Sequence, residues 1–337
     1  MRIPIPRPFL SITNGLTRLN AYHGSTALTG LRLNSTTVRM SHNGPSKESL
    51  AALAARLPKG TWDTHMHVVD LDRFPAASKG QYAPSSHTMS DAQTFFSPLG
   101  IEKMVIVQPS FYGNDNSCTL DGLKQLGASK GRAVVQFDPD QTSREQLREW
   151  HALGVRGVRL NFKSVGAKLE SESLAASLHK YADAVRELGW VLEIYIAMED
   201  IPLLEPIVPT LGDTTKICID HFGHPSPASL STAQSVAVMP GFASLANLLQ
   251  RDHVWVKVSA AYRLDKDPKH PLIQSLGREI LRTRPDRCVF ATDWPHTRFD
   301  GLDVTEYLQE LLDWCEAEGV DVQGICVDNA EELFDCR

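Results

Sequence analysis

The chain has 337 residues, of which 42% are hydrophobic and 22% are charged, and both values are ordinary for a globular protein. Its formal net charge of −6 argues against nucleic acid or an anionic membrane surface as a partner. No apolar run approaches the roughly 18–20 residues that a membrane span requires. The length is compatible with two domains or with one large α/β barrel.

The N-terminal segment differs from the rest in composition. No acidic residue precedes Glu48, and the basic residues before it give a charge of +6, which leaves −12 for the remainder. The segment is also rich in Ser, Thr and Asn, which fits a mitochondrial transit peptide. A disordered tail on a cytoplasmic protein fits the same composition. We therefore expect residues 1–45 to be a disordered or targeting extension.

From Trp62 onward, apolar segments of strand length alternate with amphipathic helical segments. The predicted strands are Trp62–Val69, Lys103–Gln108, Ala133–Phe137, Val155–Leu160, Trp190–Ile196, Lys216–Asp220, Val254–Ser259 and Cys288–Thr292. The predicted helices are Ser90–Leu99, Leu120–Ala128, Ser143–Leu153, Ser171–Leu188, Gly241–Arg251, Pro271–Arg284 and Val304–Glu318. The clearest is Ser171–Leu188, whose apolar residues recur every three or four positions. Ser171 is expected to cap its start and Gly189 its end.

This alternation predicts a parallel sheet with helices outside it. Eight such units that close on themselves form a (β/α)₈ TIM barrel, which is the α/β fold that we predict for residues 46–337 as a single domain. An open doubly wound sheet is the competing fold. No G-x-G-x-x-G or G-x-x-x-x-G-K-[ST] segment follows a predicted strand, which weakens that alternative. In a barrel, reactive groups lie at the C-terminal strand ends.

Polar side chains gather at these predicted strand ends. His65 and His67 alternate along the first strand, so they share a face with Asp63. His221 follows the sixth strand and Asp293 follows the eighth. Three histidines and one aspartate at such positions are suited to a metal, a polarised carbonyl or a proton transfer.

The segments around these residues resemble the amidohydrolase superfamily, in particular its 2-pyrone-4,6-dicarboxylate lactonase-like branch. The resemblance covers roughly Thr61 to Phe334 and rests on D-T-H-M-H-V, V-I-V-Q-P-S, V-R-G-V-R-L-N-F, I-D-H-F-G-H-P, W-V-K-V-S and T-D-W-P-H, in that order. It implies a distorted (β/α)₈ barrel that hydrolyses the ester bond of a cyclic lactone.

The resemblance also implies a role for each site residue. Asp293 would be the general base that takes a proton from water. His65, His67 and His221 would polarise the lactone carbonyl. The residues that resemble the substrate pocket are Tyr82, Ser110, Arg159, Tyr195, Arg263 and His296. Arg159 and Arg263 would clamp a substrate carboxylate, although each could form an internal ion pair instead.

The same resemblance bears on metal and substrate. His65, His67, His221 and Asp293 would be the ligands of a single Zn²⁺, and metal-free catalysis is equally compatible with the pattern. Binuclear relatives carry bridging and histidine ligands where this chain has Arg159 and Tyr195, so we do not expect two metals. The dicarboxylate lactonase has a second arginine where this chain has Val165. Together with Phe111, Val165 indicates a less polar pocket and therefore a substrate with one acidic group and an apolar portion.

Further charged residues are expected below the site. Strand parity directs Glu193, Asp63 and Lys257 inward, and buried charges need partners, so we expect these three and Arg159 to neutralise one another. Glu193 could instead be an acid or a base. The function that we expect is the hydrolysis of a small-molecule lactone that carries a carboxylate. The alternatives are a metal-dependent decarboxylase of an aromatic acid and a non-catalytic binding barrel.

Overall fold

The computed structural model describes residues 47–75, 85–163, 166, 169–267, 269–299 and 301–336. The predicted extension of residues 1–45, the predicted substrate residue Tyr82, and Val165 lie outside this part of the chain. None of the helices among the described residues is long and apolar enough to cross a bilayer.

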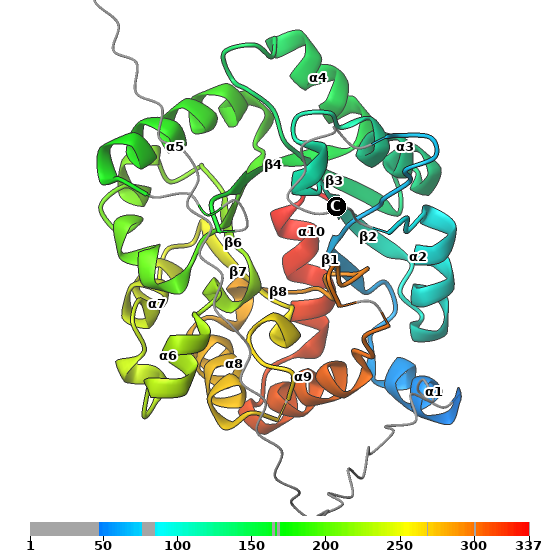
Figure 1. Cartoon of the computed structure of the whole chain (residues 1–337), viewed down its shortest axis with the longest axis vertical. Coiled ribbons are helices and arrows are strands. Elements are labelled where there is room, and N and C mark those ends of the chain that lie inside the picture. Colours follow the sequence, from blue (N-terminus) through cyan, green and yellow to red (C-terminus); the bar gives the residue numbers. More distant parts are fainter. Residues whose placement is uncertain are drawn as a thin grey trace, which may run out of the picture. The chain divides into compact units, whose positions relative to one another are not determined.

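Eight parallel strands form one sheet whose spatial order follows the chain. Figure 1 shows the strands around a common centre with helices outside them. Their bounds are β1 (Trp62–Met66), β2 (Lys103–Val107), β3 (Gly131–Val135), β4 (Val155–Asn161), β5 (Val191–Tyr195), β6 (Ile217–Ile219), β7 (Val254–Val258) and β8 (Cys288–Phe290). The predicted (β/α)₈ barrel is therefore confirmed, and the predicted strand ends are wrong by at most three residues.

The side chains that point into the barrel change from apolar to polar along the strands. Val191 in β5 and Trp255 in β7 belong to an apolar cluster inside the barrel. Two residues further along the same strands lie Glu193 and Lys257, which are fully buried. Side chains two residues apart share a strand face, so this polar layer rests directly on the apolar one.

The barrel closes less regularly between β8 and β1 than elsewhere. These strands are joined by a single bridge between Met66 and Trp294. The N–H of Asp293 donates to the carbonyl of His65 at 2.9 Å, and the N–H of His67 donates to that of Trp294 at 2.8 Å. The residues that close the barrel are thus the predicted site residues or their neighbours, and the barrel is distorted at that position.

The helices surround the sheet. Their bounds are α1 (Lys47–Arg56), α2 (Met89–Phe96), α3 (Ser117–Leu126), α4 (Arg144–Leu153), α5 (Ser171–Val185), α6 (Pro227–Thr232), α7 (Phe242–Leu249), α8 (Pro271–Thr283), α9 (Thr305–Glu318) and α10 (Asn329–Leu333). The predicted start of α5 at Ser171 is confirmed, but the prediction that Ser171 caps the helix is wrong, because Glu170 is the capping residue. Gly189 ends this segment with a φ of 62°, as its sequence predicts.

The short helix α10 covers the N-terminal ends of the strands. Glu331 accepts from the Nζ of Lys103, the first residue of β2, at 3.0 Å, and the carbonyl of Leu333 accepts from the Nζ of Lys216 at 2.9 Å. Phe334 belongs to the apolar cluster inside the barrel. Among the described residues this end is therefore closed by packed side chains, which leaves the opposite, C-terminal end for a ligand.

Candidate functional site

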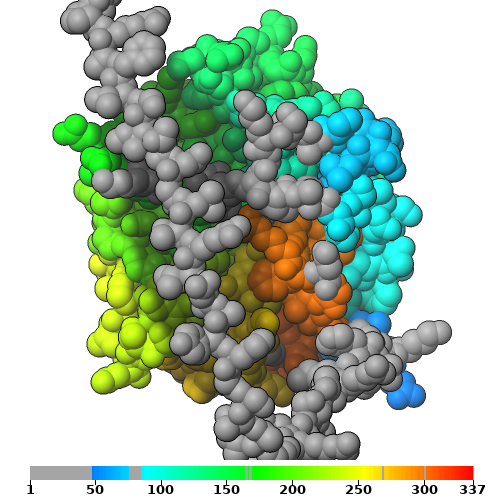
Figure 2. All heavy atoms as spheres, in the orientation of Figure 1, coloured from blue at the N-terminus to red at the C-terminus, as the bar shows by residue number. Residues whose placement is uncertain are grey.

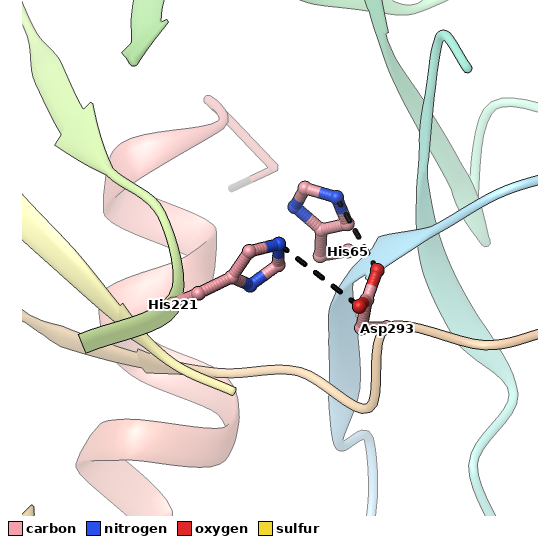
Figure 3. Close-up of side chains that lie close together, drawn as sticks. All are labelled: His65, His221 and Asp293. Carbon is pink, nitrogen blue, oxygen red and sulfur yellow. Dashed lines mark ion pairs between the residues drawn. The ribbon is translucent and has the colours of Figure 1, made fainter. Parts of the chain in front are cut away.

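Residues from three separate strands converge at the C-terminal end of the barrel. His65 lies in β1, His221 lies two residues after β6, and Asp293 lies three residues after β8. The Nε2 of His65 is 3.8 Å from Oδ1 of Asp293, and the Nε2 of His221 is 4.0 Å from Oδ2 of the same carboxylate (Figure 3). His67, just beyond β1, places its Nε2 3.5 Å from Oδ1. The predicted convergence is confirmed, and the catalytic roles of these residues stay predictions.

The backbone turns sharply at two of these residues. His221 has a φ of 53° and Asp293 a φ of 64°, so both adopt the left-handed conformation that side chains other than glycine rarely take. This conformation costs roughly 1–2 kcal/mol per residue. It occurs two residues after β6 and three residues after β8, and the two side chains are directed toward each other (Figure 3). Such backbone strain is concentrated at functional sites in proteins.

The two oxygens of Asp293 have different surroundings. Oδ2 accepts hydrogen bonds from the hydroxyl of Tyr262 and from Nε of Arg263, each at 2.6 Å. Oδ1 is buried and has no hydrogen-bond partner among the described residues. Burial alone would raise the pKa of Asp293, but Arg263 and the three surrounding histidines together outweigh it and hold the pKa well below the usual value. The carboxylate is therefore ionised at neutral pH, with Oδ1 available.

The three histidines are neutral at neutral pH. Burial holds the pKa of His65 and of His221 well below the usual value, and it also lowers the pKa of His67. The Nδ1 of His67 donates to the carbonyl of Val107 at 2.8 Å, so the lone pair of the ring is on Nε2. The Nδ1 of His221 is hydrogen-bonded to the hydroxyl of Ser259 at 2.8 Å. These bonds fix the orientation of both rings.

A charged cluster lies directly below His65. The Nδ1 of His65 is 3.0 Å from the Nζ of Lys257, and Glu193 and Asp220 each place an oxygen 3.4 Å from the same Nδ1. Lys257 also forms an ion pair with Glu193. Burial and the charge of Asp220 raise the pKa of Glu193 to about 7, against the opposing effect of Lys257. The predicted pairing of Glu193 with Lys257 is confirmed.

The other two predicted members of this cluster lie elsewhere. Asp63 accepts from the backbone N–H of His65 at 2.9 Å and from that of Thr292 at 3.1 Å. Arg159 donates to the carbonyl of Gln108 at 2.7 Å. The prediction that Asp63 neutralises Glu193 and Lys257 is therefore wrong, and Asp220 is the second carboxylate of the cluster instead. For Arg159 the prediction is confirmed only in part, because its charge lowers the pKa of Glu193 although its hydrogen bond is to Gln108.

A cavity of about 370 Å³ opens above these residues. Its lining residues are His67, Pro109, Ser110, Arg159, Lys163, Tyr195, His221, His224, Arg263, Asp293, Thr297, Arg298 and Phe299. Figure 2 shows the residues that follow β8, in orange, reaching the surface beside α2, in cyan. The lining includes four cationic side chains and one carboxylate, so the cavity is suited to an anionic ligand.

Four of the predicted substrate residues line this cavity, namely Ser110, Arg159, Tyr195 and Arg263. Arg263 forms an internal ion pair through its Nε with Asp293, which is the alternative to a substrate clamp that the sequence left open. His296 is not among the lining residues.

Two aromatic side chains that were predicted at the pocket lie outside its lining. The ring of His296 packs against those of Phe95 and Tyr262, at centroid distances of 5.7 and 5.3 Å. Phe111, which suggested an apolar pocket, is also outside the lining and packs against Tyr112 at 4.5 Å. The apolar portion expected of the substrate therefore gains no support from Phe111.

Sequence reasoning missed three ionisable residues of the lining, in addition to Thr297. Lys163 lies two residues after β4, and His224 and Arg298 lie shortly after β6 and β8. His224 is hydrogen-bonded through Nδ1 to the hydroxyl of Tyr195 at 3.1 Å, and burial lowers its pKa to about 4. His224 is the second histidine of the I-D-H-F-G-H-P segment, so the sequence could have indicated it as a site residue. Lys163 and Arg298 stand in loops, where no periodicity indicates which way a side chain points.

The site fits a metal ion only in part. One ligand atom each from His65, His221 and Asp293 lie within 4.8 Å of one another, so by distance this group could hold a metal. A metal ligand must offer a lone pair, and the ammonium of Lys257 donates to Nδ1 of His65. A neutral ring that accepts at Nδ1 carries its proton on Nε2. The group therefore fits a metal in distance, but His65 does not fit it in hydrogen bonding.

Comparison with known proteins agrees with this geometry. The family model described as Amidohydrolase matches residues 62–336. The chain is 32% identical to a 4-sulfomuconolactone hydrolase of Hydrogenophaga intermedia, over 82% of this chain and 89% of that protein, and 28% identical to a 2-pyrone-4,6-dicarboxylate hydrolase of Comamonas testosteroni, over 83% and 91%.

A solved structure supports the same assignment. A candidate 2-pyrone-4,6-dicarboxylic acid hydrolase from Pseudomonas putida superposes with a TM-score of 0.68 at 31% identity, covering 83% of this chain and 99% of that one. The resemblance inferred from the sequence motifs is thus confirmed over the whole barrel, and the chain belongs to the amidohydrolase family.

Proposed function

We propose that this protein is a hydrolase that opens a lactone carrying an anionic group. One observation supports this most directly: Nε2 of His65 and Oδ1 of Asp293, 3.8 Å apart, are both buried and without a hydrogen-bond partner among the described residues. A buried donor and a buried acceptor without partners are costly unless a ligand satisfies them. A carbonyl oxygen and a water molecule would satisfy both.

The water molecule would bind between Asp293 and His67. Oδ1 of Asp293 and Nε2 of His67 face each other at 3.5 Å, and both are acceptors because Nδ1 of His67 carries the ring proton. A water molecule can donate one hydrogen to each of them. Its oxygen would then attack the lactone carbonyl carbon while Asp293 takes a proton. His67 thereby orients the water, a role that differs from the carbonyl polarisation expected from the sequence.

The negative charge of the tetrahedral intermediate would develop on the carbonyl oxygen. His65 offers an N–H at Nε2, and Nε2 of His221 faces the same carboxylate from the other side. His65 lies behind the residues that line the cavity, so the carbonyl would be the deepest part of the bound lactone. Donors fixed before the reaction stabilise such a charge without reorganising. Collapse breaks the ring C–O bond, and Asp293 returns its proton to the departing oxygen.

The anionic group would lie against the cationic part of the lining. Arg159 and Lys163 border the cavity, whereas Arg263 is already paired with Asp293. Both curated relatives are named for substrates that are cyclic esters with sulfonate or carboxylate groups. The proposed substrate class is therefore a lactone with at least one such group.

A panel of lactones tests this proposal. The full chain is incubated with pairs of lactones that differ only in a carboxylate or sulfonate, and acid release is followed by pH-stat, with the products identified by NMR. Ring opening to the hydroxy acid, faster for the anionic member of a pair, is the expected result. Ring opening of none of the lactones would contradict it, and release of CO₂ from an aromatic acid would favour the decarboxylase.

A second arm addresses the metal. We propose that catalysis proceeds without one, because His65 presents a proton rather than a lone pair at Nε2. Ring opening should therefore persist after treatment with a chelator, with metal content measured on the same sample. Loss of activity on chelation, restored by Zn²⁺ alone, would show that a metal ion takes part in the reaction.

A further inference from the structure

The ammonium of Lys257 is enclosed below the site by three acceptors. Lys257 is fully buried, at 0% exposure. Its Nζ contacts Oε2 of Glu193, lies 3.4 Å from Oδ1 of Asp220, and lies 3.0 Å from Nδ1 of His65. An ammonium has three hydrogens to donate and no lone pair. Two of its hydrogens are donated to Glu193 and His65, and Asp220 adds an ion pair without a hydrogen bond.

The same acceptors form a donor set of the kind that binds metals. Ligand atoms of His65, Glu193 and Asp220 lie within 4.8 Å of one another, and all three residues are buried. The cation at this place is the side chain of Lys257. Burial alone would lower the pKa of Lys257, but Glu193 and Asp220 outweigh it and raise the pKa above the usual value. The cluster thus contains its own positive charge.

This contact decides which nitrogen of His65 is protonated. Nδ1 is the acceptor of the Lys257 ammonium, so the proton of the neutral ring is on Nε2. The opposite tautomer would let Nδ1–H donate to Glu193 or Asp220, but only over 3.4 Å. It would also place that N–H against the ammonium at 3.0 Å, where two donors repel each other.

We propose that Lys257 is a positioning residue: its buried ammonium replaces a metal ion among His65, Glu193 and Asp220, and it holds the proton of His65 on Nε2, directed at Asp293. Lys257 touches neither the cavity nor the reacting atoms. It acts through His65, and its effect on turnover rests on the proposed lactone hydrolysis.

The tautomer can be measured on the unmodified protein. The full chain is labelled with ¹⁵N-histidine, and the two-bond ¹H–¹⁵N correlations of His65 are assigned with a His65→Gln variant. A protonated Nε2 and an unprotonated Nδ1 are expected at neutral pH. A proton on Nδ1 would overturn the proposal. This measurement depends neither on the folding of a variant nor on the identity of the substrate.

A substitution then tests the link to catalysis. Lys257→Met keeps the length of the side chain and removes the charge, and the double variant Lys257→Met/Glu193→Gln also removes one of the two carboxylates left behind. We expect the proton of His65 to move to Nδ1 and kcat to fall about 10²–10³-fold, as for the loss of one oxyanion donor, with KM changed little.

The matched control is Lys103→Met, which removes a lysine that pairs with Glu331 at the opposite end of the barrel. It should change neither kcat nor the tautomer. A folded Lys257 variant with unchanged kcat, or with the proton still on Nε2, would contradict the proposal. If the unmodified protein opens no lactone, the proposed function fails while the tautomer measurement still decides the role of Lys257.

Discussion

The two oxygens of the Asp293 carboxylate have different roles. Oδ2 is held by Tyr262 and Arg263, which fix the orientation of the group, and Arg263 also favours its ionised form. Oδ1 has no such partner among the described residues and faces the histidines. A carboxylate with so low a pKa is a weak base on its own. It can still take a proton from water when the attacked carbonyl is polarised at the same moment.

Replacement of this residue tests its role as the base. Asp293→Asn keeps the shape of the side chain but removes the charge, so kcat should fall by about 10²–10⁴. The matched control is Asp121→Asn, since Asp121 in α3 pairs with Arg73 and does not line the cavity. Kinetics on folded samples, verified by circular dichroism, give the result. An unchanged kcat in Asp293→Asn would remove Asp293 from the mechanism.

The pH profile depends on the histidines. Burial lowers the pKa of His65, His67 and His221, so all three remain neutral as the pH falls through the usual histidine value of about 6.5. Activity that requires neutral rings is lost only when the pH falls through these lowered pKa values. We expect kcat/KM to be maintained from pH 8 down to about 6. An acid limb centred near 6.5 would contradict this prediction.

At the scale of elements, the irregular junction between β8 and β1 positions the site. Asp63 in β1 accepts from both the N–H and the hydroxyl of Thr292, directly before Asp293. Thr64 donates its hydroxyl to the carbonyl of Phe290 at 2.8 Å. Side-chain hydrogen bonds thus join the two strands where backbone pairing is sparse. The position of Asp293 relative to His65 depends on these bonds.

Thr292→Val, which is close in shape, measures the strength of this junction. It removes a hydroxyl that donates to a buried carboxylate, so the free energy of unfolding should fall by about 1.5–3 kcal/mol. Thr215→Val is the control, because Thr215 is also buried and donates only to the nearby carbonyl of Leu211 at 2.8 Å. That loss should cost about 0.5–1.5 kcal/mol. Urea denaturation compares the two, and equal losses would show that the Asp63 bond is not special.

The sequence predicted the structure best where the spacing of apolar residues is regular. The barrel strands are apolar on both faces, so their positions could be predicted, and the alternation along them placed Glu193 and Lys257 inside. The pairing of Lys257 with Asp220 could not be predicted, because it depends on how neighbouring strands are staggered. The burial of His296 away from the cavity depends on a left-handed turn, with a φ of 62°, that no periodicity indicates.

At the scale of the whole molecule, the charge of the cavity is opposite to that of the chain. The chain carries a net charge of −6, yet the cavity lining contains Arg159, Lys163, Arg263 and Arg298 against the single carboxylate of Asp293. An anionic lactone would therefore be repelled by the molecule at long range and attracted at the cavity. Over distances longer than about 10 Å these fields are screened at 0.1 M salt, so only the local attraction remains in a cell.

A salt titration separates the long-range repulsion by the net charge from the local attraction at the cavity. Lys163 is partly exposed, so salt screens its attraction for an anion. We expect KM for an anionic lactone to rise several-fold as salt increases from about 0.1 M to about 1 M, with kcat unchanged, because the Debye length falls from roughly 10 Å to 3 Å. A neutral lactone should show no such rise.

Two variants assign this attraction to the cavity. Lys163→Met should raise KM for the anionic lactone at low salt and flatten its dependence on salt. Lys130→Met, which removes a surface lysine paired with Glu102 at 2.8 Å, should leave both unchanged. The same salt dependence for anionic and neutral lactones would mean that the lining cations do not select the substrate, and the anionic substrate class proposed above would then lose its physical basis.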